Sequence, residues 1–224
     1  MSPLFITFEG LDGSGKSTHL RRASEWLTRR GIPHRVTHEP GGTPLGDAVR
    51  AIFLDSRWGA VDGLVELLLV FASRRQHLLE VIEPALRAGE HVLCDRFTDS
   101  TRAYQGYGRG VPLAAIDQVD LLATGGRRPD HTLLFDLPAE AARARGHSPS
   151  RQGRGEADRI DSEDLAFYDR VRRGFLEMAS GDARFQVLDS AGPVSVTERR
   201  MRRILKGLID GPGDPGELEE EVGA

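Results

Sequence analysis

Short apolar segments alternate along this chain with longer segments in which apolar residues recur every three or four positions. The short segments are rich in β-branched and aromatic residues and predict buried strands. They lie at residues 4–8, 34–37, 91–94, 131–135 and 185–188. The longer, periodic segments predict helices. They lie at residues 16–30, 45–54, 64–88, 112–123, 138–145, 161–180 and 194–209. Strands that alternate with helices favour one α/β domain, in which helices cover both faces of a parallel sheet.

Two polar segments do not fit this alternation. Residues 146–155 are rich in glycine, proline and arginine and show no periodicity, which is typical of an exposed loop. Residues 211–224 carry five acidic side chains and no basic one, and we expect them to form a disordered acidic tail. The folded domain is therefore expected to span residues 1–210.

Composition and charge argue against two classes of partner, nucleic acids and membranes. The chain has 30 basic and 34 acidic residues and a formal net charge of −4, which the tail accounts for, so we expect no nucleic-acid partner. The most apolar run, residues 64–72, is interrupted by Glu66 and is too short to cross a membrane, so we expect no membrane partner. Cys94 is the only cysteine, which excludes an intramolecular disulfide. Together with an N-terminus that lacks the pattern of a secretory signal, it predicts a cytoplasmic protein.

Candidate chemistry begins directly after the first predicted strand. Residues 10–17 match the pattern G-x-x-x-x-G-K-[ST] of a phosphate-binding loop. Glycines let backbone N–H groups surround phosphate oxygens, and the helix that follows presents its positive N-terminus. Lys16 would reach the β- and γ-phosphates of ATP, and the Ser17 hydroxyl would bind Mg²⁺. Lys16 and Lys206 are the only lysines among the 30 basic residues, which argues against a chance match.

The predicted ATP phosphate site is one continuous segment. It comprises Gly10, Leu11, Asp12, Gly13, Ser14, Gly15, Lys16, Ser17 and Thr18. Phosphate loops occur in enzymes and in switches, so the loop alone does not identify a reaction. The chain lacks the four apolar residues and Asp-Glu of motor ATPases and the guanine-binding sequence Asn-Lys-x-Asp. Both of these classes are therefore disfavoured.

Further motifs follow in order along the chain. They are E-G-L-D-G-S-G-K-S-T at residues 9–18, E-P-G-G-T at 39–43, D-R-F at 95–97, S-T-R-A-Y-Q-G at 100–106 and R-P-D at 128–130. In this combination the chain resembles the bacterial thymidylate kinases, a family of P-loop nucleoside monophosphate kinases. The resemblance implies the three-layer P-loop kinase fold with a five-stranded parallel sheet, a homodimer, and a mobile arginine-rich lid at about residues 143–160. It also implies phosphorylation of dTMP to dTDP by ATP with Mg²⁺, in dTTP biosynthesis for DNA synthesis.

The resemblance assigns polar residues around the phosphate loop to dTMP. Asp12 would accept a hydrogen bond from the 3′-hydroxyl of dTMP, and the alternative is a turn residue that caps backbone amides. Arg50 and Arg96 would hold the dTMP phosphate, for which a planar guanidinium is suited, and the alternative is surface ion pairing. Asp95 would either orient Arg96 or hold water bound to Mg²⁺. Ser17 and Asp95 are therefore the candidate metal ligands.

The thymine-binding segment departs from the family pattern. The family places an aromatic residue, which stacks on the base, four positions before an arginine that binds the thymine O4. Matching the sequence Arg-x-Gln selects Arg74, but position 70 is then valine and Phe71 is one residue away from the expected place. Matching the aromatic-to-arginine spacing selects Arg75. We favour Arg74 as the base-binding arginine, with Phe71 as the candidate stacking residue.

Four further residues complete the expected dTMP site. Gln105 would bind the edge of the thymine through its amide, and Tyr104 would pack on the sugar and disfavour a 2′-hydroxyl. Ser100 belongs to the same motif, and Tyr168 on the following predicted helix would cover the thymidine pocket. A buried tyrosine is equally compatible with a purely structural role.

Arginines cluster in and around the aperiodic segment. They are Arg143, Arg145, Arg151, Arg154 and Arg159. Composition alone favours a solvated loop, whereas the family has a lid there whose arginines close over ATP. The phosphate loop lacks the arginine that some family members place within it. Arg151, Arg154 and Arg159 are therefore the candidate catalytic lid residues, together with Lys16 and Arg96.

Two rival functions remain at this point. A deoxynucleoside kinase has a similar phosphate loop, but it phosphorylates a hydroxyl group and needs a carboxylate base, whereas Arg50 and Arg96 favour an acceptor that already carries a phosphate. A nucleotide-binding switch or an inactive partner-binding subunit would not need Lys16, Ser17 and the lid arginines together.

Overall fold

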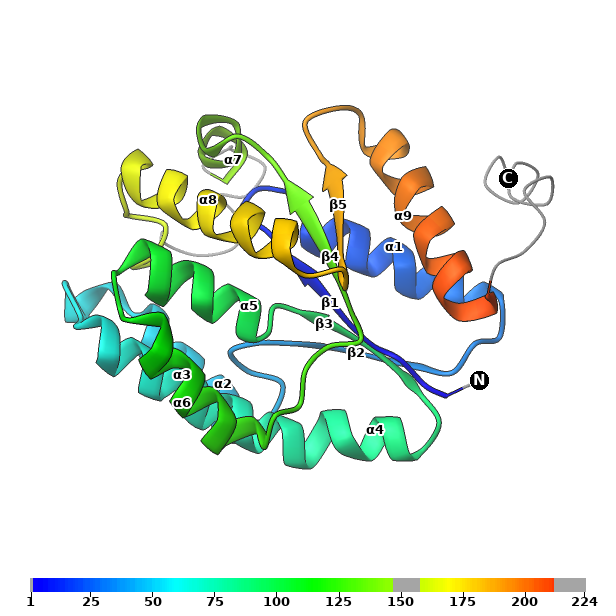
Figure 1. Cartoon of the computed structure of the whole chain (residues 1–224), viewed down its shortest axis with the longest axis horizontal. Helices are drawn as coiled ribbons and strands as arrows, with labels where there is room; N and C mark the ends of the chain where they lie inside the picture. The colour runs from blue at the N-terminus through cyan, green and yellow to red at the C-terminus, as the bar shows by residue number, and fades with distance from the viewer. Residues whose placement is uncertain (1, 147–157, 212–224) are drawn as a thin grey trace.

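The computed structural model describes residues 2–146 and 158–211, and its centre is a five-stranded sheet in the order β2-β3-β1-β4-β5 (Figure 1). The strands are β1 (Phe5–Glu9), β2 (His34–His38), β3 (His91–Asp95), β4 (His131–Asp136) and β5 (Phe185–Asp189). Every neighbouring pair is parallel. The predicted parallel sheet is therefore confirmed.

Helices cover both faces of the sheet (Figure 1). They are α1 (Lys16–Arg29), α2 (Pro44–Leu54), α3 (Gly63–His77), α4 (Glu83–Arg87), α5 (Thr98–Thr101), α6 (Leu113–Thr124), α7 (Ala139–Gly146), α8 (Leu165–Gly181) and α9 (Val194–Asp210). The described residues also contain the 3-10 helix η1 (Ser56–Trp58) and the π-helical segments η2 (Leu78–Ile82) and η3 (Arg102–Gly108). None of the described helices is long and apolar enough to span a bilayer.

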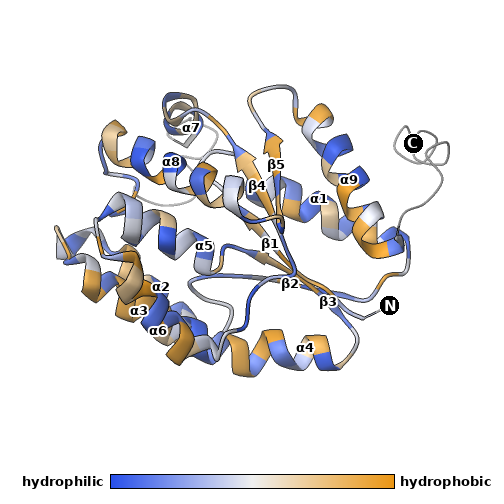
Figure 2. Cartoon of the chain, in the orientation of Figure 1, coloured by the Kyte–Doolittle hydropathy of each residue, from blue (hydrophilic) through white to orange (hydrophobic). Residues whose placement is uncertain are grey.

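Alternation along the strands decides which side chains reach which helices. Ile6 and Phe8 of β1 pack with residues of α1 and α9, and Phe5 packs on the other face against Phe97, with ring centroids 5.0 Å apart. Figure 2 shows the apolar strands enclosed between the helices. Because side chains of a strand alternate between faces, Glu9 lies on the same face as Phe5, the face that carries α3 and η3.

Two differences from the sequence prediction concern helices. The single helix expected at 64–88 is a continuous helical run in which the π-helical segment η2 separates α3 from α4. The break precedes Pro84, which has no N–H to donate to the preceding turn. No helix was expected at residues 98–108, where α5 and η3 occur. Gly106 and Gly108 lower the helix propensity there, and a π-helix does not follow the 3.6-residue period.

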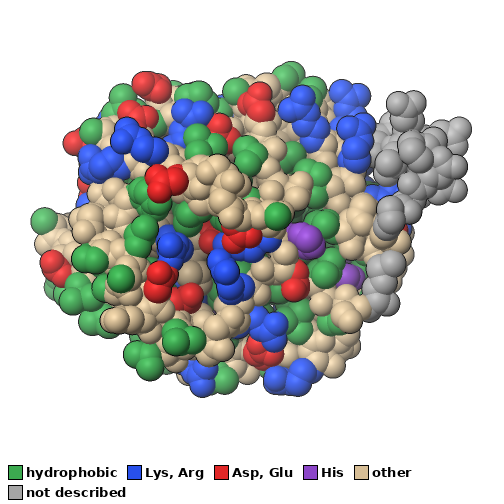
Figure 3. All heavy atoms as spheres, in the orientation of Figure 1, with side chains coloured by type: hydrophobic (Ala, Val, Ile, Leu, Met, Phe, Trp, Pro, Cys, Tyr) green, Lys and Arg blue, Asp and Glu red, His purple; other side chains and the backbone are tan. Residues whose placement is uncertain are grey.

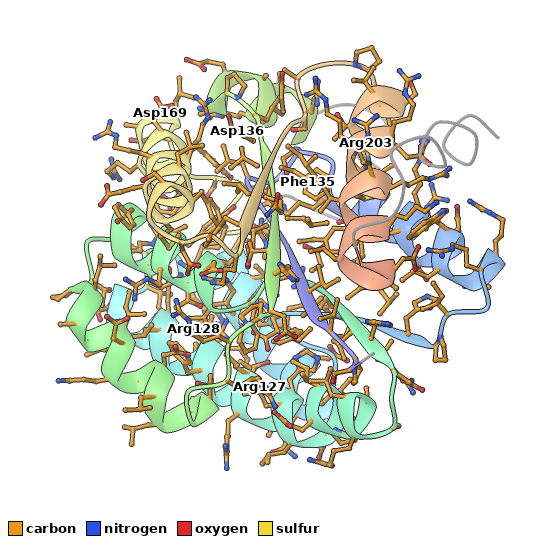
Figure 4. All side chains as sticks on the ribbon, turned by 45° about the vertical axis from the view of Figure 1, so that its right-hand side comes forward. Arg127, Arg128, Phe135, Asp136, Asp169 and Arg203 are labelled. Carbon is orange, nitrogen blue, oxygen red and sulfur yellow. The ribbon has the colours of Figure 1, made fainter. Side chains whose placement is uncertain are left out.

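A buried histidine links α1 to β4. The His19 ring stacks on Phe135, with centroids 5.0 Å apart and the ring planes 11° from parallel, and its Nδ1 is buried without a hydrogen-bond partner. Figure 4 shows Phe135 in the interior beside the sheet. Burial, followed by the positive charge of Arg22, lowers the pKa of His19 to about 4. The neutral ring is therefore the form that the fold stabilises.

We expect His19 to make the protein less stable in mild acid. In the unfolded chain a histidine binds a proton near pH 6.5, whereas His19 in the folded chain does so only near pH 4, so the free energy of unfolding falls as the pH falls from 6.5 to 4. The variant His19→Phe keeps the stacked ring and removes this dependence. Urea unfolding of both proteins at pH 7.5 and pH 4.5 should show the wild type losing on the order of 2 kcal/mol relative to the variant. Equal losses would contradict this role of His19.

Candidate active site

The phosphate loop leaves β1 at the carboxyl edge of the sheet, where parallel α/β proteins bind ligands. Gly10 has φ 134°, and a Cβ atom there would lie 2.4 Å from the carbonyl oxygen of Phe135, so only glycine fits against β4. Gly15, with φ 93°, directly precedes α1. The loop therefore delivers the chain to the N-terminus of α1, whose free N–H groups favour an anion.

Lys16 lies inside this loop rather than on its outer surface. Its side chain is 4% exposed, and Nζ donates to the carbonyl oxygen of Leu11 at 2.8 Å and lies 3.8 Å from Oδ1 of Asp12. Burial, followed by the positive charge of Arg96, lowers the pKa of Lys16 to about 8, although nearby carboxylates act in the opposite direction. The ammonium group is thus held where phosphate oxygens would enter the loop.

Ser17 and Asp95 meet at the adjacent strand end. Ser17 Oγ donates to Asp95 Oδ2 at 2.8 Å, so α1 and the last residue of β3 present two oxygen ligands side by side. Hydroxyl and carboxylate oxygens suit Mg²⁺, which usually keeps waters and phosphate oxygens as its other ligands. No cluster of three or more His, Cys, Asp or Glu side chains that could hold a metal ion occurs within residues 2–146 and 158–211. These two residues therefore fit a metal bound mainly through a nucleotide.

Asp12 joins the phosphate loop to Arg96. Asp12 Oδ1 accepts from Arg96 Nη2 at 2.9 Å, and Asp12 Oδ2 accepts from the Tyr104 hydroxyl at 3.1 Å. Burial alone would raise the pKa of Asp12, but the charges of Arg96 and Lys16, with the hydrogen bonds from Arg96 and Tyr104, outweigh it and hold this pKa well below its usual value. The carboxylate stays ionised at neutral pH, as an acceptor from a nucleotide hydroxyl requires.

Arg96 is held in an unusual backbone conformation. Its φ is 72°, the only positive φ of a non-glycine residue in the part of the chain that the structure describes. Its guanidinium donates to Ser100 Oγ at 2.8 Å and lies 4.9 Å from the centre of the Tyr104 ring. Such conformations are costly and cluster at functional sites. This backbone conformation directs the Arg96 side chain toward the phosphate loop, where it contacts Asp12.

Glu9 is a site residue to which the sequence analysis assigned no role. It is completely buried, accepts from the Phe97 backbone N–H at 2.8 Å and from Ser100 Oγ at 2.5 Å, and so lies beneath Arg96. Burial, followed by the charge of Asp99, raises the pKa of Glu9 to about 7. An acidic residue at the end of a mostly apolar strand is the sequence signal that marks this position.

The structure separates the two candidate base-binding arginines. Arg74 is 1% exposed, and its guanidinium lies between the rings of Phe71 and Phe97, 4.5 and 4.9 Å from their centres. Its Nε donates to Glu39 Oε2 at 2.6 Å, whereas its Nη1 is buried without a partner. Arg75 is exposed and donates to a carbonyl oxygen at the end of α6. The geometry thus favours Arg74, as expected.

Phe71 departs from its expected place. Its ring packs with Leu67 and Ile116 in the core between α3 and α6, and it contacts the Arg74 guanidinium. Val70, the preceding residue, belongs instead to the cluster that contains Phe53 and Tyr104. A one-residue step turns a helical side chain by about 100°, so Phe71 faces away from Tyr104. The structure gives Phe71 a packing role, and its expected stacking on the base stays a prediction.

Gln105, Tyr168 and Arg50 are the remaining residues that we expect to bind dTMP, and each is hydrogen-bonded within the protein. Gln105 donates from Nε2 to Glu66 at 2.9 Å, and the Tyr168 hydroxyl donates to the carbonyl oxygen of Ile160 at 2.9 Å. Arg50 donates to the carbonyl oxygen of Pro40 at 3.1 Å, which ties it to the loop between β2 and α2 rather than to Arg96.

The candidate lid arginines are not equivalent. Arg151 and Arg154 lie outside the described residues. Arg159 is buried, forms an ion pair with Glu66 and donates from Nη2 to the carbonyl oxygen of Phe53 at 3.0 Å, at the end of α2. The structure thus shows Arg159 bound to Glu66 and to the end of α2, and its expected catalytic role stays a prediction.

One motif lies far from the site. Asp130 of the R-P-D motif accepts from the Phe5 backbone N–H at 2.7 Å, at the amino edge of the sheet, and Arg128 lies 3.3 Å from Asp182 (Figure 4). At the opposite edge, Arg172 of α8 binds both carboxylate oxygens of Asp136, at 2.7 and 2.9 Å. Both sets of contacts fix the position of β4, and the R-P-D motif therefore stabilises the fold.

Comparison with known proteins gives a consistent result. The sequence model of the family described as "Thymidylate kinase" matches residues 8–201. A thymidylate kinase from Geobacter sp. strain M21 is 45% identical over 222 residues, covering 98% of each chain. One from Pseudomonas fluorescens strain SBW25 is 46% identical over 211 residues, covering 94% of this chain and 98% of the relative. The crystal structure of thymidylate kinase from Ehrlichia chaffeensis is 33% identical, with a TM-score of 0.71, and covers 92% of this chain and 99% of that one.

Proposed function

Since the chain belongs to the thymidylate kinase family and is an enzyme that phosphorylates dTMP in nucleotide biosynthesis, we propose that ATP and dTMP meet between the phosphate loop and Arg96. The observation that carries this proposal is the contact of Arg96 with Asp12, 2.9 Å apart, beside Lys16. It brings a guanidinium group next to a loop suited to phosphates. Two phosphorylated substrates could then lie end to end, the donor in the loop and the acceptor phosphate on Arg96.

The reaction needs no general base. The second pKa of a phosphate monoester is about 6, so the acceptor is mostly a dianion at neutral pH and can attack directly. Catalysis then depends on positioning and on neutralising charge. In this proposal the loop amides and Lys16 hold the phosphates of ATP, and Arg96 holds the phosphate of dTMP. Asp12 accepts a hydrogen bond from the 3′-hydroxyl, and the ring of Tyr104 packs on the sugar.

The thymine would lie among residues of α2, α3 and η3. Arg74 would donate from its unpartnered Nη1 to the thymine O4, and Gln105 would bind the N3 edge. We retain Ser100 and Tyr168 as further dTMP-binding residues, since Ser100 contacts Arg96 and Tyr168 is buried beside Phe167. We retain Arg50 on condition that it leaves the carbonyl oxygen of Pro40 when dTMP binds.

Magnesium is the expected cofactor. Ser17 and Asp95 would hold it, directly or through water, and when bound it neutralises charge on the β- and γ-phosphate oxygens. The Ser17 hydroxyl oxygen and the Asp95 carboxylate oxygen lie 2.8 Å apart at the end of β3, and both are of the type that Mg²⁺ prefers as ligands.

We also propose the domain organisation that the sequence predicts. One kinase domain spans residues 1–210, with a lid at about 143–160 and a tail at 211–224. Arg145 donates from both Nη atoms to the carbonyl oxygens of Ser190 and Ala191, at 2.9 and 3.0 Å, which anchors the start of the lid to the loop after β5. Arg151, Arg154 and Arg159 remain the candidate catalytic lid arginines.

We propose that the enzyme forms a homodimer through an apolar α2–α3 surface. This surface consists of the exposed side chains Leu45, Ile52, Leu64, Val65, Leu68 and Leu79. Large contiguous apolar patches on a protein surface commonly mark interfaces. The apolar colouring of α2 and α3 in Figure 2 is consistent with this placement.

Leu68→Glu should convert the dimer to a monomer. Leu68 is 52% exposed within the α2–α3 surface, and a carboxylate placed in a dimer interface would be desolvated without a partner. Sedimentation velocity should give twice the chain mass of 24.6 kDa for the wild type and the chain mass for the variant. Val194→Glu on α9 introduces the same charge at an exposed apolar residue on the other side of the sheet, and this variant should stay dimeric. A dimeric Leu68→Glu variant would place the interface elsewhere.

The expected partners are small molecules. On the face drawn in Figure 3, basic and acidic side chains are intermixed rather than gathered by sign, which supports the expectation that nucleic acid is not a partner. Cys94 is a buried free thiol, and we propose a cytoplasmic location.

A coupled assay of ADP release tests the proposed site. With ATP and Mg²⁺, we expect turnover with dTMP, weaker turnover with dUMP, and little with dCMP, AMP, GMP or thymidine. Preference for thymidine would instead indicate a deoxynucleoside kinase, because the acceptor would then be a hydroxyl group. Absence of ADP release with every acceptor would instead favour a protein that binds nucleotides without catalysing phosphoryl transfer.

A further inference from the structure

Glu66 is a completely buried carboxylate at the centre of a cluster that joins four parts of the fold. Its Oε2 accepts from Gln105 Nε2 of η3 at 2.9 Å. Its Oε1 forms an ion pair with Arg159, and Nε of Arg109 lies 3.2 and 3.3 Å from its two oxygens. Arg109 also binds Glu163 at 2.6 Å. Two carboxylates and two guanidinium groups thus balance each other in charge.

The charge balance explains how Glu66 remains an acceptor although it is buried. An unpaired carboxylate in this position would be strongly destabilising, whereas two arginines compensate its charge. An ionised carboxylate accepts hydrogen bonds and cannot donate one. The side-chain amide of Gln105 must therefore turn its NH₂ group toward Glu66, which directs its Oε1 away from Glu66.

From this geometry we propose that Glu66 is a positioning residue that presents Gln105 to the base as a hydrogen-bond acceptor. The proposal rests on the proposed function of Gln105 at the thymine edge. Thymine and uracil carry an N–H group at N3, which the fixed Oε1 accepts. Cytosine carries a lone pair at N3, which the same Oε1 repels. Without Glu66, the Gln105 amide could rotate by 180° and pair with either base.

A second buried carboxylate fixes the neighbouring base-binding group in the same way. Glu39 accepts from Nε of Arg74 at 2.6 Å, and Thr101 accepts from its Nη2 at 3.0 Å, so Nη1 is the guanidinium nitrogen that has no partner. In the proposed thymine site, Arg74 therefore supplies a fixed donor and Gln105 a fixed acceptor. This order matches O4 and N3–H of thymine and is the reverse of N4–H₂ and N3 of cytosine.

Glu66→Gln tests the proposal through substrate preference. The new amide can donate or accept toward Gln105, so its orientation is no longer fixed. We expect the ratio of kcat/KM for dTMP to that for dCMP to fall about tenfold, as the loss of one oriented hydrogen bond predicts. The KM for dTMP should rise more than kcat falls. The ratio of dTMP to dUMP should not change, because both bases carry N3–H.

Glu163→Gln is the matched control. It removes the same unit of negative charge from the same cluster, next to Arg109, but Glu163 is not among the hydrogen-bond partners of Gln105. The dTMP to dCMP ratio should remain that of the wild type in this variant. A fall in both variants, or in neither, would overturn the proposal. If Glu66→Gln does not fold, Glu66→Asp decides in its place, because it keeps the charge and withdraws the acceptor from Gln105 by one methylene.

Gln105→Leu separates this proposal from the proposed function. It removes the amide entirely, and the dTMP to dCMP ratio should fall at least as far as in Glu66→Gln. A wild-type ratio in Gln105→Leu would show that Gln105 does not bind the base, and the assignment of Gln105 would fail. A lowered ratio in Gln105→Leu with a wild-type ratio in Glu66→Gln would refute the role of Glu66 alone.

Discussion

Lys16→Ala is expected to lower kcat for dTDP formation by about 10³-fold or more while the protein remains folded. Lys16 is the cation closest to the expected position of the transferring phosphoryl group, where charge stabilisation contributes most to the rate. The fold should persist because Nζ makes one hydrogen bond, to Leu11, and Asp12 keeps its partners Arg96 and Tyr104.

A coupled ADP-release assay with dTMP, and circular dichroism through thermal unfolding, measure these two expectations. Lys206→Ala is the control, because Lys206 is the other lysine of the chain and lies near the end of α9, at the amino edge of the sheet. It should retain wild-type activity. Wild-type turnover in Lys16→Ala would show that the phosphate loop does not take part in catalysis as proposed.

Arg96→Gly is expected to lower kcat/KM for dTMP by roughly 10³-fold, with a much smaller effect on the KM for ATP. Glycine adopts a φ of 72° without strain, so this variant removes the guanidinium and spares the backbone conformation. The acceptor phosphate would then lose its proposed ligand, and Asp12 would lose its hydrogen bond at 2.9 Å. Calorimetric titration should show weakened binding of dTMP.

Arg127→Gly provides the comparison for Arg96→Gly. Arg127 binds Glu83 at 2.7 Å near the amino edge of the sheet, so its loss removes an ion pair without touching the site. Activity close to that of the wild type is expected for Arg127→Gly. If Arg96→Gly binds dTMP as tightly as the wild type does, the acceptor phosphate is held elsewhere.

The sheet and the phosphate loop were predictable because their signals are local. Each strand is a short apolar run, and each glycine of the loop has a fixed place between a strand and a helix. Segment 98–108 was not predictable in this way. It is helical because Tyr104 packs against Phe167 and Phe175 of α8, a tertiary contact that the helical period of the sequence does not reveal.

The candidate site was predictable residue by residue only in part. Arg74 was favoured over Arg75 because it matches the sequence Arg-x-Gln, and burial distinguishes the two arginines in the same sense. The packing of Phe71 against α6 was not predictable, because spacing alone does not say which face of α3 meets α6. Glu66 drew notice only as an interruption of an apolar run, since its partners Gln105, Arg109 and Arg159 come from distant parts of the chain.

Asp12 has a consequence that reaches beyond its own hydrogen bonds. Its carboxylate belongs to the phosphate loop, the proposed site of the donor, and also accepts hydrogen bonds from Arg96 and Tyr104 of the proposed acceptor site. Binding of either nucleotide should therefore alter a side chain that the other nucleotide contacts. The two affinities should be thermodynamically linked, and because such linkage is mutual, each substrate should change the affinity for the other by the same factor.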